Sequence, residues 1–94
     1  MNPVRKRVHL FISGRVQGVA FRVEMEIRAN HLKLSGFVRN LEDGRVEAAI
    51  EGDEEKVDKL VKWTKRGPMF AKVTDLQVIE EEDKTEFDNF KIIY

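Results

Sequence analysis

The chain has 94 residues, so we expect residues 1–94 to form one domain with a modest core and no large cavity for a bulky cofactor. Lysine plus arginine and aspartate plus glutamate number 17 each, so no net charge draws the protein towards nucleic acid or a membrane. The absence of cysteine excludes disulfides, thiolate catalysis and cysteine-ligated metals, and two histidines are too few for a histidine-rich metal site.

No apolar run reaches the length of a membrane span or a signal sequence, and we therefore expect a soluble, cytoplasmic protein. Charged residues make up 36% of the chain, above the usual quarter, which predicts a densely ionic surface. This high charge, together with the absence of cysteine, favours a thermophilic source.

The N-terminal region predicts a strand after a short lead-in. Residues 1–6 are polar and basic, and we expect them to be frayed. A strand is predicted from Arg7 to Ser13, because apolar residues from Val8 to Ile12 alternate with other types. His9 faces away from the apolar side, so we expect it at the surface rather than as a ligand.

The segment Gly14–Arg22, with the sequence GRVQGVAFR, lies between this strand and a predicted helix. A glycine-containing turn from a strand into a helix can direct several backbone N–H groups into one concavity, where the positive end of the helix dipole adds to the field. Arg22, at the start of the helix, offers a planar fork of donors suited to phosphate. The residue types fit an anion cradle, and taken alone they also fit an ordinary turn with a surface arginine.

The first helix is predicted from Arg22 to Lys33. Apolar residues at helical spacing form one stripe that should face the core, namely Phe21, Met25, Ala29 and Leu32. Val23 and Ile27 lie on another face, where we expect them to pack at the side of the core rather than to bind a partner.

A β-hairpin is predicted next. Its strands run from Ser35 to Leu41 and from Arg45 to Glu51, and the turn Glu42-Asp43-Gly44 contains an Asp-Gly pair suited to left-handed dihedrals. In the second strand, alternation predicts that Val46, Ala48 and Ile50 point inward and that Arg45, Glu47 and Glu51 point outward.

A second helix should begin at Gly52 and Asp53, with Asp53 as the N-cap. Its acidic first turn favours the positive helix end. The buried stripe is predicted to be Val57, Leu60, Val61 and Thr64, flanked by Trp63. Gly67 is expected to end the helix, and Pro68 prevents its continuation.

The C-terminal third predicts two strands around an acidic loop. Val73–Ile79 is the first of them, and a change of phase between Val73 and Leu76 predicts a bulge or a late strand start. Glu80–Glu86 is expected to be a solvated loop. Asn89–Tyr94 should be the last strand, with three residues on one face, Phe90, Ile92 and Tyr94.

The order of elements is strand, helix, strand, strand, helix, strand, with room for a short fifth strand. This order predicts an α+β fold, a ferredoxin-like βαββαβ sandwich in which an antiparallel sheet carries two helices on one face.

Two segments together resemble the acylphosphatase family. The first is GRVQGVAFR, which matches through Gly14, Val16, Gln17, Gly18, Val19, Phe21 and Arg22. The second is GFVRNLEDGRVEAAIEG, which matches through Gly36, Phe37, Val38, Asn40, Gly44, Val46 and Gly52. The resemblance continues through Gly67-Pro68 to the closing aromatic strand. Family members often carry glycine near the end of the first helix, where this chain has Lys33, so the C-cap geometry is open.

The resemblance implies hydrolysis of an acyl phosphate, the mixed anhydride of a carboxylic acid and phosphoric acid. It implies that Arg22 and Asn40 are catalytic, with Asn40 holding the attacking water through its side-chain amide. Taken in isolation, Asn40 would be a strand-end or turn residue. The cradle would bind phosphate through the backbone amides of Gln17, Gly18, Val19, Ala20 and Phe21.

The chemistry of these residues fits that reaction. The departing carboxylate is already a stable anion, so no general acid is required. The phosphoryl group is negative throughout, and it is stabilised by fixed donors and one permanent cation. We see no acidic cluster arranged to hold Mg²⁺, and we expect neither a metal nor a cofactor. A substrate phosphate oxygen is our hypothesis for the base. The expected partner is a small acyl phosphate, without nucleic acid or membrane, and the expected state is a monomer.

Arg15 and Arg39 add positive charge near the cradle, where they either steer anions or serve as solvated surface residues. Two other functions compete with hydrolysis. A nucleic-acid module on the same fold would stack bases on aromatics of its central strands, but RVEAAIE has none and the net charge is zero. A non-catalytic regulatory or scaffold domain would not need both Arg22 and Asn40, which are intact. Phosphate release from a simple acyl phosphate separates all three functions.

Overall fold

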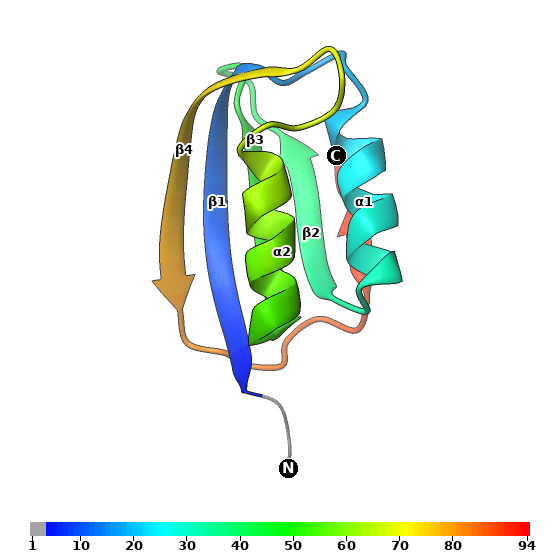
Figure 1. Cartoon of the computed structure of the whole chain (residues 1–94), viewed down its shortest axis with the longest axis vertical. Coiled ribbons are helices and arrows are strands. Elements are labelled where there is room, and N and C mark those ends of the chain that lie inside the picture. Colours follow the sequence, from blue (N-terminus) through cyan, green and yellow to red (C-terminus); the bar gives the residue numbers. More distant parts are fainter. Residues whose placement is uncertain (1–3) are drawn as a thin grey trace.

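The computed structural model describes residues 4–94, so residues 1–3 of the expected lead-in lie outside the described residues. The elements, in chain order, are β1 (Arg5–Arg15), α1 (Phe21–His31), β2 (Ser35–Asn40), β3 (Val46–Asp53), α2 (Glu54–Thr64), β4 (Lys72–Glu81) and β5 (Phe90–Ile92) (Figure 1). The first strand begins at Arg5, so the prediction of a frayed segment up to residue 6 is wrong at its C-terminal end. No helix within residues 4–94 has the length and apolar character needed to cross a membrane.

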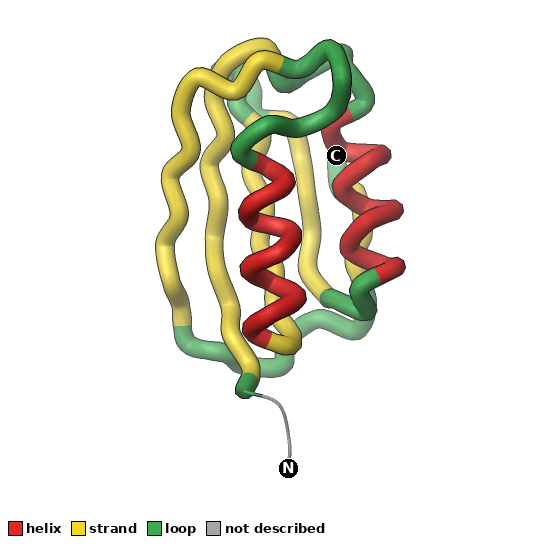
Figure 2. The backbone as a smooth tube through the Cα atoms, in the orientation of Figure 1, coloured by secondary structure: helices red, strands yellow, loops and turns green. Residues whose placement is uncertain are grey.

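The five strands form one sheet in the order β4-β1-β3-β2-β5, and both helices cover the same face (Figure 2). The ferredoxin-like α+β prediction is confirmed. The sheet is not wholly antiparallel, however, because β5 pairs in parallel with β2. The reason is visible in Figure 1: β4 ends where β2 begins, and the chain crosses to the far edge before β5 sets out in the direction of β2.

The core lies between the sheet and the two helices. Its buried side chains come mainly from β1, β3 and both helices and include Val8, Leu10, Ile12, Met25, Ala29, Val46, Ala48, Ile50, Val57 and Leu60. The predicted stripes are confirmed, although Leu32 and Val61 are only partly buried. Val23 and Ile27 do not pack at the side of the core, since they are 50% and 61% exposed. Each follows a buried residue by two positions, about 200° around the helix, and so faces solvent.

The helix ends largely follow the sequence signals. The Asp53 carboxylate accepts hydrogen bonds from the backbone N–H groups of Glu55 and Lys56, at 2.9 and 3.4 Å, which confirms the predicted N-cap. Gly67, with φ 72°, adopts a left-handed conformation just beyond α2. Lys33, with φ 59°, adopts the same conformation after α1. This answers the C-cap question, because a lysine occupies the left-handed position at a cost of about 1 kcal/mol.

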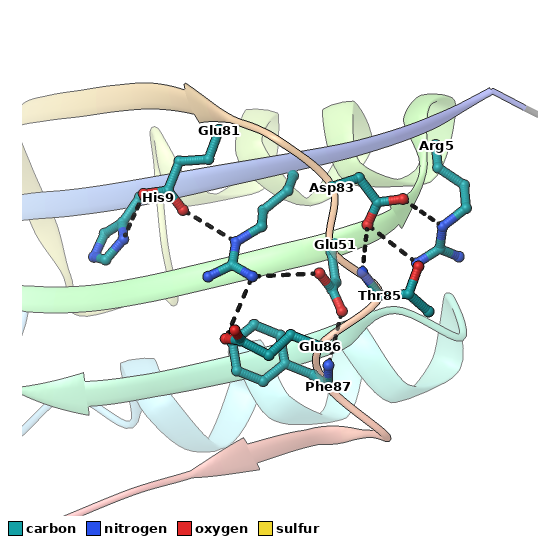
Figure 3. Close-up of polar contacts among 9 residues, drawn as sticks. Arg5, His9, Glu51, Glu81, Asp83, Thr85, Glu86 and Phe87 are labelled. Carbon is teal, nitrogen blue, oxygen red and sulfur yellow. Dashed lines mark hydrogen bonds and ion pairs between the residues drawn. The ribbon is translucent and has the colours of Figure 1, made fainter.

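The outward face of the sheet differs from its prediction. Glu47 and Glu51 point outward as expected, yet they are only 7% and 0% exposed. Residues 82–89 cross this face, and the Phe87 backbone N–H donates to Glu51 at 2.9 Å (Figure 3). Arg5 donates to Asp83 at 2.7 Å, and this bond holds the pKa of the Asp83 carboxyl below its usual value. The acidic loop is therefore partly bonded to the sheet rather than simply solvated.

His9 lies on the predicted face of β1 and is partly buried there. Its ring stacks on Phe11, with centroids 5.0 Å apart, and its Nε2 lies 2.7 Å from a Glu47 oxygen. Burial pushes the pKa of Glu47 upward, but the hydrogen bonds from His9 and Arg39 outweigh it, so the pKa lies below its usual value. Arg39 thus pairs with Glu47 on the face opposite to the helices.

Candidate active site

The end of β1 is shaped by a bulge in its neighbour β4. Ser13 pairs with Asp75 and Gly14 with Val73, which leaves Thr74 as an extra residue and confirms the predicted bulge. Gly14 has φ 119°, and a Cβ at this position would lie 2.1 Å from the backbone oxygen of Lys72. Only glycine fits here, because any side chain would collide with the backbone of β4.

Residues 16–20 form the loop from β1 into α1 and lie at the end of the sheet where β2 finishes (Figure 1). Gly18 has φ 75° and Ala20 has φ 66°, while Val19 between them has no positive φ. Such alternation of backbone handedness turns successive N–H groups towards one concavity. The left-handed alanine is strained by about 1 kcal/mol, and strain of this kind is characteristic of functional loops.

The N-terminus of α1 has no side-chain cap. Ala20 occupies the N-cap position, and its methyl side chain has no oxygen to accept from the first N–H groups. A helix start leaves up to four such donors without an intrahelical partner, and together with the dipole they favour an anion. The predicted phosphate-binding amides of residues 17–21 lie in this loop and its junction with α1.

The side chain of Gln17 ties this loop to the β2–β3 hairpin. Its Nε2 donates to the backbone oxygens of Leu41 and Arg45, at 2.8 and 3.0 Å. Leu41 directly follows Asn40, so the tie sets the loop beside the end of β2. We predicted Gln17 only as a backbone donor. Nothing in the local sequence signals this contact, which joins residues 24 and 28 positions apart.

Asn40 is the last residue of β2. Its side-chain oxygen Oδ1 is buried and has no hydrogen-bond partner among residues 4–94. Buried polar atoms are nearly always paired, so an orphaned acceptor marks a place for an external donor. Because Oδ1 can only accept, it suits an O–H group such as that of a water molecule.

Arg22 is the second residue of α1, and its guanidinium lies against the ring of Tyr94, with Cζ 5.4 Å from the ring centroid. The backbone N–H of Ile93 donates to Val38 at 3.0 Å, which fastens this end of the chain to β2 two residues before Asn40. The predicted aromatic strand end therefore contacts the predicted catalytic arginine. The predicted strand Asn89–Tyr94 is shorter in the structure, where β5 ends at Ile92, and the sequence gave no signal for the contact of Tyr94 with Arg22.

The remaining predicted charges are arranged differently. Arg39 is committed to Glu47 on the open face, and alternation directs it away from its neighbour Asn40. Arg15 is exposed at the end of β1 and has no ion pair in the described part of the chain. Within residues 4–94, no group of three or more His, Cys, Asp or Glu side chains is placed to hold a metal ion.

Comparison with known proteins agrees with this geometry. The model of the acylphosphatase family matches residues 8–92. The chain is 48% identical over 90 residues to an acylphosphatase of Syntrophobacter fumaroxidans, covering 96% of this chain and 93% of that one. It is 50% identical over 88 residues to an acylphosphatase of Methylococcus capsulatus, covering 94% and 96%. The crystal structure of acylphosphatase from Bacillus subtilis superposes with a TM-score of 0.90 at 39% identity, covering 95% of this chain and 99% of that chain. The chain therefore belongs to the acylphosphatase family of hydrolases acting on acid anhydrides.

Proposed function

We propose that the protein hydrolyses the carboxyl–phosphate bond of acyl phosphates to a carboxylate and inorganic phosphate. The backbone amides of residues 17–21 and the Arg22 guanidinium hold the phosphoryl group, and Asn40 orients the attacking water. The observation that carries the proposal is the buried, unpaired Oδ1 of Asn40 beside an uncapped helix end.

The donors suit the charge that must be stabilised. The phosphoryl oxygens are negative before, during and after transfer, so donors already in place need little reorganisation when the reaction occurs. The uncapped start of α1 supplies backbone N–H groups, and Arg22 adds a permanent cation on the same helix end. Its planar fork can grip two phosphoryl oxygens at once.

The step itself balances without a protein base. The oxygen of water bonds to phosphorus, and the bond between phosphorus and the acyl oxygen breaks with its electron pair leaving on the carboxylate. Asn40 Oδ1 accepts one O–H of the water and fixes its direction of approach. A phosphate oxygen of the substrate takes the water proton, which gives inorganic phosphate. Positioning of this kind can contribute several kcal/mol when the reacting atoms are near attack geometry.

The proposal also covers the oligomeric state of the protein, its location in the cell and its need for a cofactor. We propose that residues 1–94 act as one domain and as a monomer in the cytoplasm, on a small acyl phosphate, without a metal or organic cofactor. The cradle donors are assigned the charge stabilisation that a metal would otherwise supply.

Phosphate release from a panel of acyl phosphates tests the function directly. Turnover should proceed at the same rate with and without a chelator. Activity that disappears in EDTA and returns with Mg²⁺ or Zn²⁺ would contradict the metal-independent mechanism, and no release from any acyl phosphate would contradict the function itself.

Replacing Asn40 with alanine separates rate from binding. Asn40 is assigned to the water and not to the ground-state phosphate, so Asn40→Ala should lower kcat by about tenfold or more while inhibition by inorganic phosphate stays nearly constant. Asn89→Ala is a suitable control, because Asn89 is exposed outside the site. If phosphate inhibition weakens as much as kcat falls, Asn40 binds phosphate instead.

A further inference from the structure

A second recessed surface lies on the helical side of the molecule, and the proposed hydrolysis does not use it. It is a groove of about 370 Å³ between α1 and α2. Its apolar lining comes from both helices and consists of Ile27, Leu32, Leu60 and Trp63. A hollow of about 460 Å³ adjoins it past Trp63 and reaches Met69. We call the two together the helix groove.

The floor of the helix groove exposes apolar atoms that the fold does not need. Ile27 is 61% exposed, on the side of α1 that does not contact the core. Trp63 packs one side against Phe21, with ring centroids 5.2 Å apart, while the Arg28 guanidinium lies 4.8 Å from its ring centroid. Arg28 is itself tethered to Glu24, at 3.5 Å. A positioned tryptophan with a cation on it is typical of an interface anchor.

The rim of the helix groove is basic. Four cations surround Trp63 on the C-terminal half of α2 and just beyond it, namely Lys59, Lys62, Lys65 and Arg66. None of the four forms an ion pair with any of residues 4–94, whereas the N-terminal half of α2 has Asp58 paired with Lys6 at 2.9 Å. The positive charge of this rim is therefore local, even though the chain as a whole is neutral.

We propose that the helix groove docks an acidic amphipathic segment of a partner protein, with apolar side chains in the groove and carboxylates on the α2 rim. The recessed apolar floor between two helices has the form used for helix-in-groove recognition, in which anchors recur at helical spacing. The cations of the rim favour a negatively charged partner and raise the rate constant of its association. We favour a protein segment over a bilayer, because the apolar lining lies in a groove between two helices, which a third helix can enter.

The test uses Trp63 as its own reporter, because it is the only tryptophan in the chain. The probe is a synthetic peptide of about 15 residues without tryptophan, with leucines at helical spacing and glutamates elsewhere. It should shift the Trp63 emission saturably, and added salt should weaken the binding. Peptides with lysine for glutamate, or with serine for leucine, should bind at least about tenfold more weakly.

Matched variants locate the binding surface. The pair Lys59→Glu and Lys62→Glu should weaken binding of the acidic peptide by about tenfold or more, while Lys84→Glu with Lys91→Glu changes the same charge elsewhere and should have little effect. Ile27→Gln should weaken binding several-fold, and Val23→Gln, on the same helix but outside the groove, should not. Acyl phosphate turnover should be unchanged in all of them.

Three results would overturn the proposal. The first is no saturable change in Trp63 emission with the acidic peptide up to about 1 mM. The second is equal affinity for the acidic and basic peptides. The third is a shift with phosphatidylserine vesicles but not with the peptide, which would assign the groove to a lipid surface.

Discussion

The two helices each have 11 residues, but their N-termini differ in how their free backbone N–H groups are capped. The start of α2 is closed by Asp53, whose carboxylate accepts two backbone N–H bonds, and its first turn carries Glu54 and Glu55. The start of α1 has Ala20 in a left-handed conformation, no side-chain cap among residues 4–94, and both Arg22 and Glu24 in its first turn. Every helix presents a positive end with unpaired donors. The α2 end is capped by a side chain, which stabilises the fold, whereas the α1 end is where we propose that the substrate anion binds.

The largest expected effect comes from the cation at the open end. Arg22→Lys keeps the charge but loses the planar fork, so turnover should fall by about a hundredfold or more. Inhibition by inorganic phosphate should weaken too, because the product uses the same contacts. Thermal melting should change little, since the Arg22 side chain is not part of the core and lies against the exposed ring of Tyr94. Arg15→Lys is the matched control just before the loop, and a folded Arg22→Lys enzyme with near-normal turnover would remove the side chain from the mechanism.

Giving α1 the kind of cap that α2 has should make the two ends alike. In Ala20→Asp, a carboxylate would compete for the first N–H groups and repel the phosphoryl group, so we expect phosphate inhibition and kcat/KM to fall by about tenfold or more. Ala20→Gly is the control, because it keeps the left-handed backbone without adding charge. Turnover that survives in Ala20→Asp would mean that the helix end does not hold the phosphate.

The reverse experiment removes the side-chain cap from the N-terminus of α2. Asp53→Ala removes both capping bonds and should lower the free energy of unfolding by about 1 kcal/mol, measured by chemical denaturation. Turnover at a temperature where the variant is folded should equal that of the unchanged protein. A specific loss of turnover would show that the two helix ends are not independent.

Much of the fold was predictable because its signals are local. Asp53 directly precedes an acidic helical turn, which predicted the N-cap. The apolar alternation changes phase after Val73, which predicted the bulge opposite Gly14. Arg22 and Asn40 were found through two long motifs, not through any property of either residue alone. The roles that we propose for them, phosphate binding and orientation of water, are to be tested by the experiments described above.

What escaped prediction depends on contacts between distant segments. Alternation gave the correct face for Glu51, but its burial depends on Phe87, 36 residues later, crossing the sheet. The parallel direction of β5 depends on which end of the sheet the chain has reached after β4. The contact of Arg22 with Tyr94 joins residues 72 positions apart, which no local pattern reports.

The place of β1 in the sheet has a consequence for how the protein is made. During synthesis β1 is made before both of its neighbours, β3 and β4, and β4 ends only at Glu81. The loop that follows β1 is therefore synthesised well before the segments that surround it: Lys72 lies against Gly14, and Tyr94 lies against Arg22, although each comes more than 50 residues later in the chain. Such distant pairings slow folding, because a long stretch of chain must lose conformational entropy before the stabilising contacts between its ends can form. A chain that stopped before residue 94 would contain every residue of the proposed cradle and still lack the contact of Arg22 with Tyr94.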